Sequence, residues 1–194
     1  MADELKRRLV HASGSGLVAL YLLANYFDFG LTWARFGLLM VVLSLGVIGL
    51  EFLRLRVGLE WVLYDKLTRE YEQDQFAGYG YYMLSMTVAV LVFPPEIALP
   101  AMLMLALGDP ISGAVSDDSL KFIKGPKVLV TMFVVSAIIA APFLYETPLA
   151  VVAAALGATV ADGIKIRIGD YIVDDNLTIP IYAGVLAWLA LEFL

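Results

Sequence analysis

The chain has 194 residues, of which 61% are hydrophobic and only 16% are Asp, Glu, Lys or Arg, and its mean hydropathy is +0.83. Soluble domains carry roughly 25% charged and 45–50% apolar residues, so these values all but exclude a soluble globular domain. They also exclude a disordered chain, which is poor in apolar residues. The absence of cysteine excludes disulfides, thiolate metal sites and a cysteine nucleophile. We therefore expect an all-α polytopic membrane protein, with residues 1–194 forming a single integral-membrane domain.

Seven stretches of the chain are apolar enough to form membrane-spanning helices, each of which needs about 20 mostly apolar residues. They cover residues 13–29, 34–53, 79–93, 96–115, 127–145, 148–162 and 177–194. The basic residues indicate the orientation, because cytoplasmic loops are enriched in Lys and Arg. With the N-terminus in the cytoplasm, only Arg35 of the 13 basic residues falls on the opposite side. The sequence therefore predicts about seven spans and a cytoplasmic N-terminus.

The first candidate site residue is His11, the only histidine. Spacings of three and four place Glu4, Arg8 and His11 on one face of a helix. These side chains either point together into the cytoplasmic mouth of the bundle, or belong to an interfacial helix that merely follows the positive-inside rule.

Residues 54–78, between the second and third spans, form the longest polar segment. Its apolar residues recur at near-helical spacing, which predicts an amphipathic helix at the cytoplasmic interface. Glu51 and Arg54 lie around the start of this segment. They form either an intrahelical ion pair or part of a site, since charged residues at membrane depth usually face a partner. Arg69 and Glu70 within it are either ordinary solvated charges or part of the same site.

Gly108-Asp109-Pro110, followed by Ser112, is the sharpest local motif. It ends an apolar run, and its proline predicts a helix break that frees backbone groups. Asp109 is either a helix cap or a metal ligand. Lys121 and Lys124 follow in a loop with Lys127, where ammonium groups can neutralise phosphates or simply satisfy the positive-inside rule. No G-x-x-x-x-G-K-[ST] motif occurs.

The last cytoplasmic loop is rich in acids, with Asp162, Asp170, Asp174 and Asp175 close together and Asn176 next to them. Hard oxygen ligands suit Mg²⁺, which usually binds one or two carboxylates together with substrate phosphates. All these candidates fall at the cytoplasmic ends of the spans, whereas a transporter usually has polar groups near the bilayer midplane. This pattern favours an enzyme that acts on a lipid headgroup with a water-soluble co-substrate.

The order of the motifs resembles the dolichol kinase family, a group of CTP-dependent integral-membrane kinases that includes phytol kinases and a CTP-dependent diacylglycerol kinase. Residues 4–11 (ELKRRLVH) resemble the family's opening E-x-x-R-K-x-x-H, and residues 51–54, 69–70 and 78–79 resemble its middle segment. Residues 108–112 (GDPIS) are similar to G-D-x-x-[AS], and 175–180 (DNLTIP) to D-N-L-x-x-P. The family's K-[ST]-x-E-G reads Lys121-Phe-Ile-Lys124-Gly125 here, so Phe122 replaces a hydroxyl residue and Lys124 a glutamate.

The resemblance implies a kinase that transfers the γ-phosphate of CTP to a polyprenol-type alcohol at the cytoplasmic membrane face, with no nucleic-acid partner. A lipid cytidylyltransferase, which attacks the α-phosphorus, is the nearest alternative, although the CDP-diacylglycerol synthase signature is absent. The other alternative functions are a small transporter and a purely structural subunit. In the kinase, Asp109 and Asp175 are expected to bind Mg²⁺, with Asp162 as a third ligand. The expected catalytic residues are Asp109 and His11, and His11 or a nearby carboxylate is expected to accept the proton of the lipid hydroxyl. The residues expected to contact the nucleotide are Lys121, Lys124, Gly108, Ser112, Asn176, Arg54 and Arg69.

Overall fold

The computed structural model describes residues 2–58, 68, 73–116, 122–165, 167–168 and 171–193. The helices are α1 (Ala2–Ser13), α2 (Ser15–Tyr26), α3 (Trp33–Phe52), α5 (Gly78–Val92), α6 (Pro95–Leu103), α7 (Asp109–Ala114), α8 (Pro126–Leu144), α9 (Pro148–Gly163) and α10 (Asp175–Phe193). Two π-helical turns, η1 (Leu53–Val57) and η3 (Met104–Gly108), extend α3 and join α6 to α7. The prediction of an all-helical chain is confirmed except for one antiparallel pair of two-residue strands, β1 (Arg167–Ile168) and β2 (Tyr171–Ile172).

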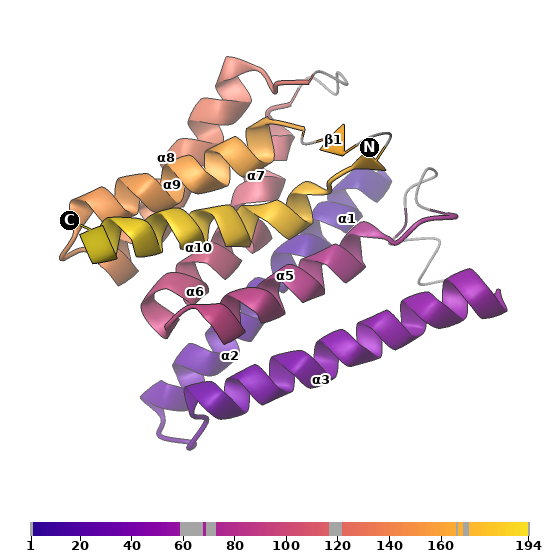
Figure 1. Ribbon diagram of the computed structural model, residues 1–194, viewed down its shortest axis with the longest axis horizontal. Coiled ribbons are helices and arrows are strands. Elements are labelled where there is room, and N and C mark those ends of the chain that lie inside the picture. The colour runs from indigo at the N-terminus through magenta and orange to yellow at the C-terminus, as the bar shows by residue number, and fades with distance from the viewer. Residues whose placement is uncertain are drawn as a thin grey trace.

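The helices run along a common direction, and their connections gather at two ends of the bundle (Figure 1). The α2–α3, α5–α6 and α8–α9 connections lie at one end, together with the C-terminus. The N-terminus, the end of α3 and the α9–α10 connection lie at the other. Because six of the seven expected apolar stretches match a helix, or the α6–η3–α7 rod, within two residues at each end, composition along the chain was a good guide to helix position.

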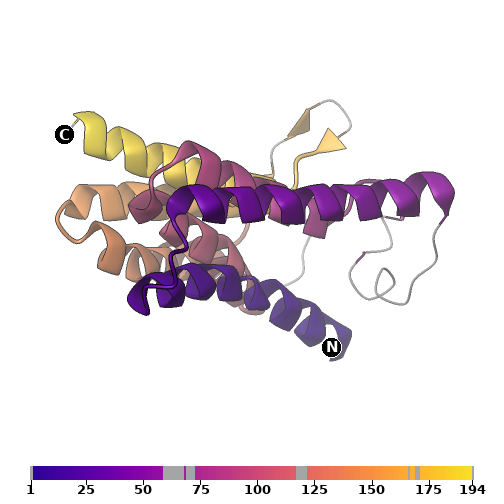
Figure 2. The same ribbon diagram turned by 90° about the horizontal axis from the view of Figure 1, so that it is seen from below.

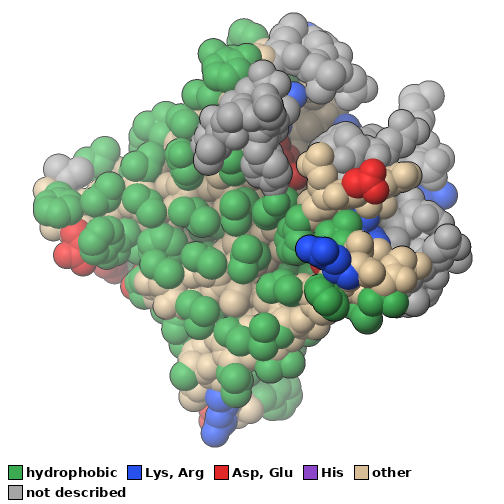
Figure 3. All heavy atoms as spheres, turned by 45° about the vertical axis from the view of Figure 1, so that its right-hand side comes forward, with side chains coloured by type: hydrophobic (Ala, Val, Ile, Leu, Met, Phe, Trp, Pro, Cys, Tyr) green, Lys and Arg blue, Asp and Glu red, His purple; other side chains and the backbone are tan. Residues whose placement is uncertain are grey.

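Four of the described helices are long and apolar enough to cross a membrane: Trp33–Val57, Pro95–Ala114, Pro126–Leu144 and Asp175–Phe193. Two shorter apolar helices, Gly78–Val92 and Pro148–Gly163, accompany them. The rod of α6, η3 and α7 is mostly buried, whereas most residues of α3 and α8 face outwards. Figure 3 shows a face covered largely by hydrophobic side chains, with charged groups only near its margins. This surface supports association with a membrane.

Small residues bring α9 and α10 together. Ala154, Ala158 and Ala161 of α9, and Ala183 and Ala187 of α10, are buried in the core. A Cβ atom on Gly157 would lie 2.4 Å from the carbonyl oxygen of Tyr182, so the two backbones are in direct contact there. Small residues permit such close approach between helices in membranes, where packing replaces the hydrophobic effect as the source of association.

The helix break expected at Gly108-Asp109-Pro110 does not occur. The chain stays helical from Pro95 to Ala114, and the irregularity is the widened turn η3, in which the Asp109 N–H donates to the carbonyl of Met104, five residues earlier. In this pattern the partner of the Leu105 carbonyl would be the N–H of Pro110, which proline lacks. The motif therefore widens the helix and leaves one carbonyl available to a side chain.

Candidate functional site

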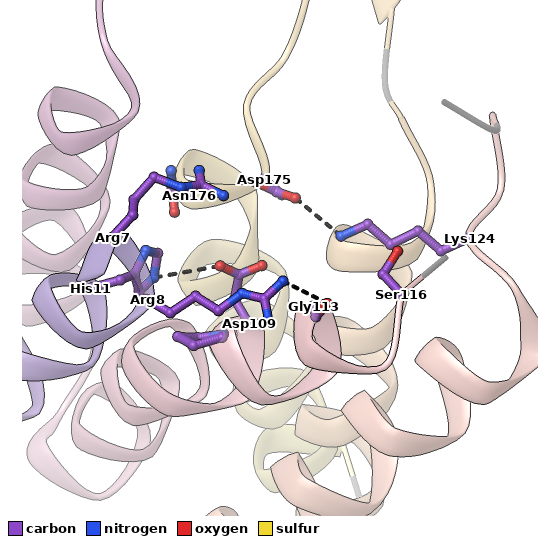
Figure 4. A pocket seen from close by; sticks show the side chains of 10 residues that line it. Arg7, Arg8, His11, Asp109, Gly113, Ser116, Lys124, Asp175 and Asn176 are labelled. Carbon is purple, nitrogen blue, oxygen red and sulfur yellow. Dashed lines mark hydrogen bonds and ion pairs between the residues drawn. The ribbon is translucent and has the colours of Figure 1, made fainter. Parts of the chain in front are cut away.

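A polar cavity of about 160 Å³ lies where α1, α7, the segment before α8 and the start of α10 meet. Figure 4 shows side chains from these four regions pointing into it. The cavity is lined by Arg7, Arg8, His11, Asp109, Pro110, Gly113, Ser116, Lys124, Asp175 and Asn176. Residues separated by more than 160 positions in the chain thus share one site.

Three carboxylates converge at this cavity because each stands near the end of a helix. Asp109 and Asp175 are the first residues of α7 and α10, and Asp162 is the second-last residue of α9. One carboxylate oxygen from each lies within 4.8 Å of the others. These acids are the three that the sequence predicted as magnesium ligands, and the structure brings all of them together.

Lys124 lies against two of these acids. Its Nζ is 2.6 Å from Asp162 Oδ1 and 3.3 Å from Asp175 Oδ2. Its backbone is held by the bridge between Ile123 and Ile164, in which the Lys124 N–H donates to the Gly163 carbonyl at 2.9 Å. Burial lowers the pKa of Lys124, but the charges of Asp175, Asp162 and Asp109 outweigh burial and raise that pKa above its ordinary value. The side chain is therefore a permanent cation in this site.

Ser112 positions the most buried of the acids. The Asp162 residue is 2% exposed, and its Oδ2 accepts a hydrogen bond of 3.2 Å from Ser112 Oγ. Since Lys124 binds Oδ1, both oxygens of the buried carboxylate have donors, as a buried charge requires. The sequence analysis predicts that Ser112 contacts the nucleotide. In the structure Ser112 contacts Asp162 and does not line the polar cavity.

His11, on α1, contacts both η3 and α5. Its Nε2 is 3.0 Å from the Leu105 carbonyl that Pro110 leaves available and 3.6 Å from Asp109 Oδ2. The ring packs edge-on against Tyr82 at a centroid distance of 4.6 Å, and the Tyr82 hydroxyl donates to the His11 carbonyl at 2.9 Å. Because a carbonyl oxygen only accepts, Nε2 carries a proton in this contact. The proton-accepting nitrogen of the neutral ring is then Nδ1.

Two groups in the cavity suit an anionic ligand and a cation. Arg7 and Arg8 face it from α1, and Arg8 Nη2 donates to the Gly113 carbonyl at 3.0 Å. Asn176 is 8% exposed, and its Oδ1 has no hydrogen-bond partner among the described residues. A buried carbonyl oxygen without a donor is costly, and a hard cation or a ligand donor would satisfy it. The three carboxylates and this amide oxygen therefore form a donor set that fits Mg²⁺.

A second cavity of about 300 Å³ adjoins the first and is mainly apolar. It is bounded by the α1–α2 segment, α3, α5 and the start of α10, and Figure 2 shows α1–α2 and α3 running on the same side of the bundle. Three residues, Arg7, His11 and Asn176, line both cavities. The remaining walls are Val10, Ser13, Gly14, Leu17, Val47, Gly78, Tyr79, Tyr82 and Met83.

The other predicted residues lie elsewhere. Arg54 binds both oxygens of Glu51 at 2.9 Å and donates to the carbonyls of Gln73 and Gln75, so it ties the end of α3 to the chain before α5. Glu51 also accepts from the Ala77 N–H and the Tyr79 hydroxyl. Gly108 is buried in η3, where a Cβ would lie 3.1 Å from Met132 Sδ. Lys121, Arg69 and most of the expected helix within 54–78 lie outside the described residues, as does the side chain of Glu4.

Three residues of the site, Gly113, Ser116 and Tyr82, were not singled out in the sequence, and Arg7 was placed on the helix face of His11 without being predicted as a site residue. Arg7 carried a signal, because it stands four residues before His11 and shares its helix face. Tyr82 carried none, because its role arises from a contact between α5 and α1 across 71 residues.

Comparison of the chain with models of known protein families, with curated proteins and with solved structures found no match in any of the three. The chemistry of the site therefore has to be inferred from its own residues.

Proposed function

We propose that this protein is a CTP-dependent lipid kinase that transfers the γ-phosphoryl group of CTP to a polyprenol-type alcohol. In this proposal the chain crosses the membrane about seven times, with α2 as the first span and the N-terminus in the cytoplasm. The end of the bundle that carries the polar cavity then faces the cytoplasm, where CTP is available. The concentration of Lys and Arg at that end supports the orientation.

The observation that carries the proposal is the junction between the two cavities. A polyphosphate needs cations and a place for a divalent ion. The polar cavity is lined by Arg7, Arg8 and Lys124 and by two of the three carboxylates, and the third, Asp162, lies next to it against Lys124. A hydrocarbon chain needs apolar walls, and the neighbouring cavity offers them. An alcohol at the head of a lipid would meet the polyphosphate at His11, which lines both cavities.

The reaction follows from this arrangement. The lipid hydroxyl oxygen forms a bond to the γ-phosphorus, the bond from that phosphorus to the bridging oxygen breaks, and CDP leaves. His11 accepts the hydroxyl proton on Nδ1 while Nε2 stays bonded to the Leu105 carbonyl. Asp109, Asp175 and Asp162, with Asn176, would hold Mg²⁺, which neutralises charge on the phosphates. The arginines and Lys124, with Lys121 as an expected addition, hold the phosphate oxygens.

The decisive experiment uses purified protein with Mg²⁺, a panel of lipid alcohols and lipid phosphates, and CTP labelled at either the α- or the γ-phosphorus. Label that reaches an alcohol from the γ position alone supports the kinase. Label from the α position identifies a cytidylyltransferase, and no transfer from either position to any lipid in the panel contradicts the proposal.

Asp109→Asn tests the role of the triad in the same assay. The variant is expected to lose activity while remaining folded, because the amide keeps the shape of the side chain but removes its charge. Asp74→Asn is the matched control, since Asp74 is exposed and outside both cavities. Near-normal turnover in Asp109→Asn, measured on monodisperse protein, would contradict the metal site.

A further inference from the structure

The ammonium group of Lys124 contacts two of the three carboxylates to which a divalent cation would also bind. Its Nζ contacts one oxygen of Asp162 and one of Asp175, and those two residues supply two of the three converging carboxylates. A cation that binds these oxygens must therefore displace the ammonium or share its ligands with it. Like charges at contact distance repel strongly where water is scarce.

Among the residues that the structure describes, the cavity and its acids bring together as many cationic side chains as carboxylates. Three cationic side chains, Arg7, Arg8 and Lys124, face the cavity or its acids, and three carboxylates face them. A divalent cation alone would leave an excess of positive charge, and a polyphosphate alone an excess of negative charge. A complex of the two brings less negative charge than the polyphosphate alone, because the cation cancels part of it.

Hydrogen bonds hold the backbone of Lys124 in place, whereas its side chain is long and has several rotatable bonds. The Lys124 N–H is bonded to the Gly163 carbonyl, and the next bond of the bridge joins the Lys165 N–H to the Phe122 carbonyl. The four-carbon side chain pivots from this anchor, and Figure 4 shows it reaching across the cavity mouth beside Ser116. Because Lys124 also lines the polar cavity, an anion bound there lies within the range of its ammonium group.

We propose that Lys124 closes the acidic triad to a bare divalent cation, so that the cation binds only together with a polyphosphate that takes over the ammonium group. The inference rests on the proposed function, because it assigns the triad to a metal–nucleotide complex. The buried Oδ1 of Asn176, which has no partner among the described residues, points independently to a ligand at this site. Lys124 thereby couples metal binding to anion binding.

Equilibrium dialysis with radioactive Mn²⁺ tests this coupling on the full-length protein in a neutral detergent. Mn²⁺ is offered alone, with inorganic tripolyphosphate and with CTP. The wild-type protein is expected to retain Mn²⁺ only in the two arms with polyphosphate. Lys124→Met is expected to bind Mn²⁺ alone about tenfold or more tightly than the wild type does, because a contacting positive charge has been removed, and to gain much less from tripolyphosphate.

Lys127→Met is the matched control, because Lys127 is exposed, lines neither cavity and loses the same charge three residues away. It is expected to behave as the wild type does. Lys124→Arg keeps the positive charge and is expected to keep the triad closed to Mn²⁺ alone. If Lys124→Met is not monodisperse, the wild-type and Lys124→Arg arms still decide the question.

The coupling is wrong if wild-type protein binds Mn²⁺ alone as tightly as with tripolyphosphate, if folded Lys124→Met binds it no more tightly than wild type, or if no arm retains Mn²⁺. These failures are distinct from failure of the kinase. Lipid labelled from γ-labelled CTP together with tight binding of bare Mn²⁺ would overturn the coupling alone. Coupled binding without any labelled lipid would overturn the kinase and leave the coupling intact.

Discussion

At the scale of single residues, the His11 ring is positioned by a backbone carbonyl that lacks its usual partner within the helix. Pro110 has no N–H, and the widened turn η3 would assign that N–H to the Leu105 carbonyl. The His11 Nε2 takes its place at 3.0 Å. Because this contact requires a proton on Nε2, the tautomer of the neutral ring is set, as it is when a carbonyl or carboxylate orients a functional histidine.

His11→Ala is expected to lower kcat by about 10²–10⁴-fold if the ring accepts the proton of the lipid hydroxyl. Binding of CTP should change little, because Arg7, Arg8 and Lys124 remain in the cavity. The measurements are steady-state kinetics and nucleotide binding on the same preparation. Leu9→Ala, an exposed position on the same helix, is the control. A twofold loss would show that His11 has only a packing role.

At the scale of helices, the close contact between α9 and α10 sets the geometry of the triad. Asp162 is near the end of α9, and Asp175 and Asn176 begin α10. The two helices contact along their buried alanines and at Gly157, whose position allows no Cβ. Any separation of these helices moves one part of the acidic cluster relative to the other.

Gly157→Ala is therefore expected to lower both stability and activity. The added Cβ would meet the backbone of Tyr182 at 2.4 Å, and overpacking of this kind typically costs about 1–3 kcal/mol. Thermal unfolding in detergent should show a lower Tm than in the wild type. Gly49→Ala on α3, where a Cβ meets nothing within 4 Å, serves as the matched control and should leave the Tm nearly unchanged. Equal Tm values for both variants would contradict the contact.

At the scale of the whole molecule, the outer surface is apolar and the polar cavity lies at one end. Exposed apolar side chains lie along α3 and α8, while α1 and the start of α10, which carry charged residues of the cavity, lie at the end that holds the N-terminus (Figure 1). Under the proposed function, the orientation in the membrane decides which compartment supplies the water-soluble substrate.

The absence of cysteine makes this orientation testable with single-cysteine variants. Asp74→Cys and Glu146→Cys introduce exposed thiols that are separated by three apolar helical segments, so the proposed topology puts them on opposite sides. A membrane-impermeant maleimide should label Glu146→Cys in intact cells and Asp74→Cys only after permeabilisation. The reverse pattern would contradict the orientation, and labelling of both from one side would contradict the number of spans between them.

The positions of the helices could be predicted from the sequence because they depend on local composition. A run of apolar residues ended by charged residues forms a helix in a membrane wherever it lies in the chain, since its backbone must be hydrogen-bonded within the segment. The three acids were also recognisable, because each stands beside the end of such a run. The backbone conformation at Pro110 could not be predicted, since the same local residues are compatible with a widened helical turn and with a break in the helix.

The partners of the polar side chains depend instead on contacts between distant helices, and local composition carries no information about these. The ion pair of Arg54 with Glu51, three residues earlier, was one of the two alternatives that the sequence offered, whereas the contact of Lys124 with Asp162 and Asp175 could not be predicted locally. Tyr82 and Arg7 join the site because α1 packs against both α5 and η3. The packing of helices far apart in the sequence places these charges together, and this packing turns a row of helix ends into a candidate active site.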